Sequence, residues 1–71
     1  MKNKIRIAEL IVKYRKDKGL SQGEFGELLG VSACAVSKWE RELSYPDIFL
    51  LADISDILSI SIDEMMGKKQ T

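Results

Sequence analysis

The stretch from Ser21 to Glu40, SQGEFGELLGVSACAVSKWE, decides the fold. Ser21 and Glu24 form a capping-box pattern, in which each side chain hydrogen-bonds the backbone N–H of the other residue. Gly30 stands where the first short helix must end, because glycine adopts the left-handed conformation of a helix C-terminus at little cost. Ser32 is placed to cap a second helix. The pattern predicts two short helices with a turn between them, Gln22–Leu29 and Ala33–Arg41.

The second of these helices has two different sides. Val36 and Trp39 recur at the spacing of a buried side, which favours core packing of Trp39 over a role as a platform for stacked bases. The other side carries small and polar residues, namely Ala33, Cys34, Ser37, Lys38 and Arg41. Two short helices joined by a glycine-containing turn form a helix-turn-helix, whose second helix can enter the major groove of DNA. We therefore expect the polar side to approach another surface closely.

The flanking sequence predicts three more helices. Apolar residues at helical spacing mark Ile5–Lys18, which Gly19 closes, and Asp47 can cap a helix over Ile48–Leu58. Ser61 and Glu64 repeat the capping-box pattern before Ile62–Met66. The expected core residues are Ile7, Leu10, Ile11, Tyr14, Phe25, Leu29, Leu51, Ile54, Leu58 and one of Met65 and Met66. We predict an all-α fold of five helices in one domain, 1–71, with an ordered core of about 5–66 and a frayed tail, 67–71.

Composition excludes several classes of function. The 71 residues include one cysteine and no histidine, which argues against disulfides and against a His/Cys metal site. No nucleophile–base pair or phosphate-binding loop is present, so we expect neither catalysis nor a cofactor. Charged residues interrupt the apolar N-terminal run, which argues against an export signal, and no stretch reaches the roughly 20 apolar residues of a membrane span. The single thiol fits a reducing compartment, so we expect a cytoplasmic protein.

The charges are unevenly distributed along the chain. Lys and Arg number 11, as do Asp and Glu, so the net charge is zero. Residues 1–18 carry seven basic and two acidic side chains, and residues 19–71 carry four basic and nine acidic ones. A local basic surface can therefore exist on a neutral molecule, although DNA-binding domains are often basic overall.

Several motifs at fixed offsets resemble the phage repressor and Cro-like (XRE-type) helix-turn-helix family of transcriptional regulators. These motifs are GLSQ, EF, LLGVS, VSKWE, SYPD and ISIDE, and the resemblance spans about Ile7 to Met66. It implies a lambda-repressor-like domain that binds double-stranded DNA, usually as a homodimer on a pseudo-palindromic operator. The helix over Ala33–Arg41 would be the recognition helix in the major groove.

The resemblance also implies roles for individual residues. Gln22 matches a family glutamine that contacts a phosphate, and Ser32 matches a capping residue that touches a phosphate or a base edge. Arg15 and Glu40 match an ion pair that ties the first helix to the third. The positions that would face the groove are Ala33, Cys34, Ser37 and Lys38, and Arg41 shares their side of the helix.

The chain departs from the family pattern at four positions. Ala33 and Cys34 stand where long polar side chains are common, so Lys38 becomes the strongest candidate for reading a base. Glu42 and Ser59 stand where glycine is frequent. The neutral net charge, Ala33, Cys34 and Glu42 keep open the alternative of a scaffold for contact with a protein partner. A variant of the DNA-binding interpretation is the antitoxin of a toxin–antitoxin pair. Oxidation of Cys34 near a helix N-terminus is a further, less favoured hypothesis.

Overall fold

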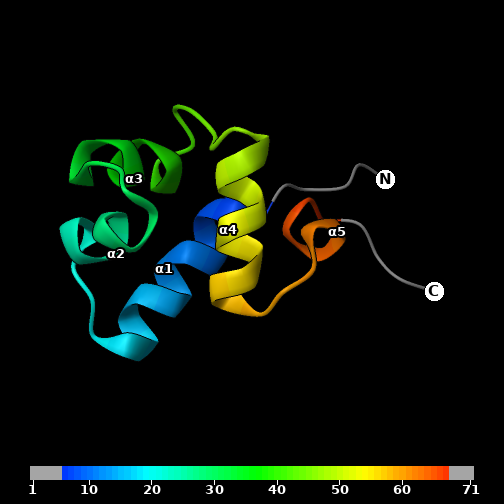
Figure 1. Ribbon diagram of the computed structural model, residues 1–71, viewed down its shortest axis with the longest axis horizontal. Coiled ribbons are helices and arrows are strands. Elements are labelled where there is room, and N and C mark those ends of the chain that lie inside the picture. Colours follow the sequence, from blue (N-terminus) through cyan, green and yellow to red (C-terminus); the bar gives the residue numbers. More distant parts are fainter. Residues whose placement is uncertain (1–5, 68–71) are drawn as a thin grey trace.

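The computed structural model describes residues 6–67, which form five helices (Figure 1). The helices are α1 (Ile7–Lys18), α2 (Gln22–Leu29), α3 (Ala33–Glu40), α4 (Ile48–Leu58) and α5 (Ile62–Met65). The predicted all-α architecture is confirmed. The expected helical residue Ile5 and residues 68–71 of the expected tail lie outside the described part of the chain.

Polar caps set the starts of four helices. Each cap side chain accepts a hydrogen bond from the backbone N–H three residues later. The pairs of cap and donor are Ser21 with Glu24, Ser32 with Ala35, Asp47 with Leu50, and Ser61 with Glu64. At Ser21 the reciprocal bond also forms, because its own N–H donates to Glu24 Oε1 at 2.8 Å. The second predicted capping box forms only by half. Its Glu64 carboxylate lies instead 3.6 Å from Arg6 Nη1.

Three predicted helix boundaries differ from the structure by one or two residues. The first helix begins at Ile7 rather than Ile5, because Arg6 has left the helical conformation and its N–H donates to the Met65 carbonyl at 2.8 Å. Arg41 and Met66 are C-terminal caps rather than the last residues of their helices. Gly67, the first residue of the predicted tail, adopts a left-handed conformation, and its N–H donates to the Glu64 carbonyl.

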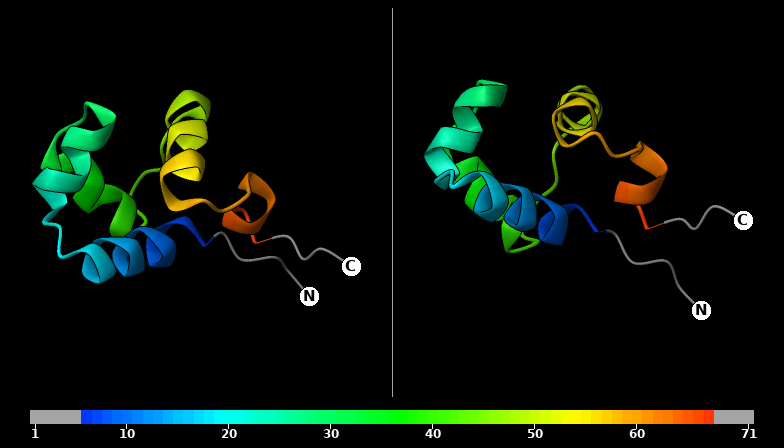
Figure 2. Two further views of the ribbon diagram at one scale, coloured as in Figure 1. Left: turned by 60° about the horizontal axis from the view of Figure 1, so that its bottom comes forward. Right: turned by 90° about the horizontal axis from the view of Figure 1, so that it is seen from below.

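The core lies where all five helices meet. Figure 2 shows α1 with α2 and α3 at one end of the molecule and α4 and α5 toward the other. Nine buried side chains form the centre, namely Ile7, Leu10, Ile11, Phe25, Val36, Trp39, Leu51, Ile54 and Met65. The predicted stripe residues Tyr14, Leu29 and Leu58 are partly buried and pack against this centre. Met65 is the methionine that closes the core, and Met66 is half-buried.

Backbone geometry favours glycine at Gly26 in α2, at Glu42 after α3 and at Ser59 after α4. A Cβ added at Gly26 would lie 2.5 Å from the Val31 carbonyl oxygen, so glycine is required by the approach of the α2–α3 turn rather than of α3 itself. Glu42 and Ser59 adopt left-handed conformations with φ of 61° and 56°. This explains physically why glycine suits both positions, since a Cβ is disfavoured in that region.

Candidate nucleic-acid interface

The outer face of α3 consists of short or flexible side chains over a rigid apolar base. Val36 and Trp39 on the inner side are only 0% and 4% exposed, which confirms the predicted core side of the helix. Ala33, Cys34, Lys38 and Arg41 are exposed, and Ser37 is half-buried at the edge. The sequence-predicted groove residues therefore share one face. Figure 1 shows α3 at the edge of the molecule, away from α5.

The start of α3 is suited to an anion. Ser32 is exposed, and its Oγ accepts the Ala35 N–H at 3.1 Å. The other N–H groups of the first helical turn have no acceptor within the helix, and together with the helix dipole they favour a phosphate or another anion. Small side chains follow directly at Ala33 and Cys34, so an approaching surface could come close to the backbone here.

Lys38 in α3 and Arg41, the C-terminal cap of that helix, differ in their hydrogen bonding. Arg41 Nε donates to the Ser37 carbonyl at 3.3 Å and to the Ser37 Oγ at 3.2 Å, so its side chain bends back along the outer face. Lys38 makes no side-chain hydrogen bond or ion pair with any residue of the described part, 6–67. Its ammonium group is free to meet a partner.

Gln22, Arg15 and Glu40 form one network, so the structure brings a predicted phosphate contact next to the predicted ion pair. Arg15 donates to both carboxylate oxygens of Glu40, at 2.7 Å and 3.0 Å, and Gln22 Nε2 donates to Glu40 Oε1 at 3.0 Å. Burial alone would raise the pKa of Glu40. The hydrogen bonds from Arg15 and Gln22, with the charges of Arg15 and Lys16, outweigh burial and hold that pKa below its ordinary value. The α1–α3 ion pair is confirmed as a structural feature.

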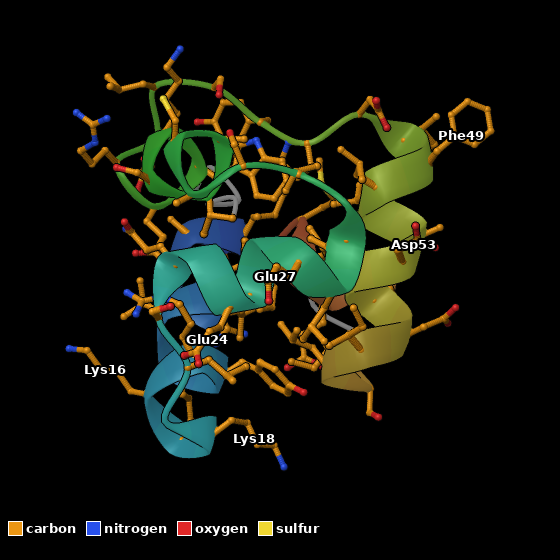
Figure 3. The ribbon with its side chains drawn as sticks, turned by 60° about the vertical axis from the view of Figure 1, so that its left-hand side comes forward. Lys16, Lys18, Glu24, Glu27, Phe49 and Asp53 are labelled. Carbon is orange, nitrogen blue, oxygen red and sulfur yellow. The ribbon has the colours of Figure 1, made fainter. Side chains whose placement is uncertain are left out.

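The α1 helix carries most of the basic side chains of the described residues, although Lys13 pairs with Asp17 at 2.9 Å. In Figure 3, Lys16 and Lys18 extend from α1, whereas Glu27 and Asp53 extend from α2 and α4. Lys16 is close enough to Glu40 for its charge to lower the pKa of that carboxyl group. The basic residues of α1 therefore continue toward the Gln22 end of the α3 surface. A duplex on α3 would meet positive charge on this side.

Sequence reasoning missed four exposed apolar side chains between α3 and α4. Leu43, Tyr45, Ile48 and Phe49 are 64%, 50%, 64% and 81% exposed. The run Ile48-Phe49-Leu50-Leu51 alone does not tell which members face outward, but the predicted core residues Leu51, Ile54 and Leu58 set a helical register with Phe49 on the opposite side. The structure has this register, with Leu51 buried and Phe49 on the outside.

No helix between residues 6 and 67 is both long and apolar enough to cross a membrane. Over the same part of the chain, no three or more His, Cys, Asp and Glu side chains are grouped so that they could hold a metal ion.

Comparison with known proteins agrees with this geometry. The model of a helix-turn-helix family, HTH_3, matches residues 11–65. The chain belongs to this family. It is 37% identical over 62 residues to the HTH-type transcriptional activator BcrR of Enterococcus faecalis, covering 87% of this chain and 30% of that protein. It is 36% identical over 64 residues to the HTH-type transcriptional regulator SinR of Bacillus subtilis, covering 89% of this chain and 58% of SinR.

Solved structures show the same fold. The P22 c2 repressor in complex with a synthetic operator superimposes with a TM-score of 0.78 and 32% identity, covering 89% of this chain and 96% of that one. The five helices are thus those of a phage-repressor-like DNA-binding domain. The chain spans about a third to three fifths of the curated relatives BcrR and SinR.

Proposed function

We propose that this chain binds double-stranded DNA in a sequence-specific way and regulates transcription, with α3 in the major groove. The observation that carries the proposal is the outer face of α3, where exposed Lys38 and small side chains lie over buried Val36 and Trp39. Such a helix can enter a groove about 12 Å wide without disturbing its own core. The relationship to the P22 c2 repressor, which was solved with an operator, supports the same function.

The α3 face divides into backbone-binding and base-reading parts. Lys38 would read a base directly, with guanine O6 and N7 as its natural acceptors. Ala33 and Cys34 offer only apolar contacts, such as with a thymine methyl group. Ser32 and Arg41 would contact phosphates or base edges at the two ends of the helix, with Ser37 between them. A readout with one long cationic side chain at its centre favours modest specificity.

Gln22 would fix the register of the domain on the DNA backbone. One N–H of its amide is held by Glu40 Oε1 at 3.0 Å. A primary amide has a second N–H, which stays available for a phosphate oxygen. Phosphate contacts of this kind position a protein on DNA without reading its sequence.

We further propose that the protein acts as a homodimer on an operator with two half-sites, roughly 34 Å apart. Operator binding would take place in the cytoplasm, where the exposed thiol of Cys34 stays reduced. A contact with another protein is a second candidate use of the surface. The exposed apolar side chains between Leu43 and Phe49 support this second candidate, because exposed apolar patches often mark protein–protein contacts.

The test compares two lysine variants on duplexes that the protein itself selects from a randomised pool. Lys38→Ala should lose about 1–3 kcal/mol of discrimination at one base pair per half-site. Lys18→Ala, on the far end of α1, should keep the base preferences unchanged. Equal base preferences of wild type and Lys38→Ala would exclude Lys38 as the reader. Failure of the wild type to enrich any sequence would overturn the proposed function.

A further inference from the structure

A pocket of about 200 Å³ opens between α1 and the end of α4, with the connection that leads on to α5. In Figure 1, α1 and α4 both end at the bottom of the molecule, and the pocket lies near these two ends. Its lining side chains are Leu10, Lys13, Tyr14, Asp17, Leu58 and Ile60. None of these six belongs to α3, so the pocket is distinct from the proposed DNA face.

We propose that this pocket binds a small apolar carboxylate. The apolar part of the molecule lies inside the pocket, and its carboxylate lies at the mouth, where Lys13 meets it. This inference goes beyond the proposed function, because it assigns a second ligand to a different surface of the domain. A molecule in the pocket leaves the outer face of α3 open for DNA.

The floor of the pocket is apolar and held by the core. Leu10 is only 7% exposed, and Tyr14, Leu58 and Ile60 are half-buried and pack against the core. The Tyr14 ring stands edge-on to that of Phe25, with 5.9 Å between the ring centres and 62° between the planes. An apolar cavity of about 150 Å³ is enough to hold a benzene molecule. The pocket therefore has room for one ring with a short chain.

The charges around the pocket favour an anion. Lys13 lines the pocket, and Lys18 Nζ lies 5.8 Å from the centre of the Tyr14 ring. Figure 3 shows Lys18 extending from the end of α1. Asp17 is the acidic member of the lining, and its carboxylate accepts from Lys13 Nζ at 2.9 Å. Two ammonium groups therefore outnumber one carboxylate, so an amine would be repelled more than it is attracted.

The ion pair at the mouth can open for a ligand. The side chains of Lys13 and Asp17 are 72% and 60% exposed. Exposed ion pairs of this kind contribute little to stability, so Lys13 can exchange Asp17 for a ligand carboxylate at small cost. A molecule of roughly ten non-hydrogen atoms that stays partly exposed should bind with a dissociation constant on the order of 1 mM.

The test titrates the whole chain with phenylpropionate and follows the NMR shifts of the backbone amides. Phenylpropylamine is the matched probe, because it has a similar apolar body and the opposite charge. Lys13→Gln is compared with Lys16→Gln, since both lysines are exposed on α1 and Lys16 is not among the lining residues. Thermal melting should show both variants folded like the wild type. No DNA is present, so the result does not depend on the proposed function.

Phenylpropionate should shift the amides of Tyr14 and Ile60 in a saturable way in the wild type and in Lys16→Gln. Lys13→Gln should weaken this binding at least about threefold, and the wild type should bind phenylpropylamine at least about threefold more weakly than phenylpropionate. Shifts that do not saturate, or that spread over the surface away from the pocket, would overturn the proposal. Equal affinity for the acid and the amine would also overturn it, as would equal losses in the two lysine variants, because Lys13 would then have no part beyond its charge.

Discussion

Arg15 and Glu40 join the first and third helices through a forked ion pair, with Nε to Oε2 at 2.7 Å and Nη2 to Oε1 at 3.0 Å. Their side chains are only 17% and 8% exposed, so water screens the pair weakly. Gln22 donates to the same carboxylate and adds the second helix to the connection. The ion pair, with Gln22, therefore helps to fix the orientation of α2 and α3 relative to α1.

The first prediction concerns this pair. Glu40→Gln leaves the Arg15 guanidinium without its counter-charge in a mostly buried position, which should lower the free energy of unfolding by about 2–3 kcal/mol at neutral pH. The folded-state pKa of Glu40 is held below its ordinary value by Arg15 and Gln22 despite burial. Its contribution is therefore present above about pH 4.3, the ordinary glutamate pKa, and is lost as pH falls further.

Urea denaturation measured from about pH 3 to about pH 7, a range that brackets the ordinary glutamate pKa, checks this loss of stability. Wild type should lose stability toward acid more steeply than Glu40→Gln. Glu27→Gln is the control, because Glu27 is exposed and makes no ion pair within residues 6–67. If Glu40→Gln and the wild type show parallel acid profiles, the account of the pair is wrong.

The second prediction contrasts two glycines of α2. Gly26→Ala should destabilise severely, by about 2–4 kcal/mol, because its Cβ would meet two backbone carbonyls of the turn at 2.5 and 3.3 Å. Gly23→Ala should stabilise by about 0.5–1 kcal/mol, because its Cβ would find only ordinary contacts at 3.8 Å. Thermal melting of the two variants measures both effects. Changes of the same sign would contradict the structure of the α2–α3 turn.

The third prediction concerns the left-handed residues. Glu42→Gly and Ser59→Gly should each raise stability by about 0.5–1 kcal/mol, since glycine removes left-handed strain at some cost in unfolded-state entropy. Each should raise the melting temperature by several degrees in a domain this small. Glu27→Gly provides the comparison, because glycine within a helix should instead cost up to about 1 kcal/mol. A loss of stability in Glu42→Gly would mean that φ at this position is not positive.

Local signals predicted much of this structure, and contacts between distant residues account for what they missed. Capping residues such as Ser21 and Ser32 act on atoms three positions away, so the helix starts followed from the sequence. The start of α1 at Arg6 was not predicted, because it depends on a hydrogen bond from the Arg6 N–H to the carbonyl of Met65, which is distant in sequence. The bond from Gln22 to Glu40 likewise depends on how two helices dock.

The fourth prediction tests the register of α3. Trp39 is 4% exposed and packs in the core under the proposed DNA face. Trp39→Ala should cost about 3–5 kcal/mol, which is most of the stability of a small domain. Circular dichroism with urea should show the variant largely unfolded or easily unfolded. A melting curve like that of the wild type would place Trp39 outside the core.

The central claim is that α3 reads DNA in the major groove while neighbouring groups hold phosphates. The most direct measurement is a titration of the wild-type protein with its selected duplex and with a shuffled duplex at several salt concentrations. The selected duplex should bind at least about 10³-fold more tightly. Affinity for both should fall linearly with the logarithm of salt, with a slope of about −0.9 per phosphate contact. Equal affinity for the two duplexes, or binding that salt does not weaken, would contradict the claim.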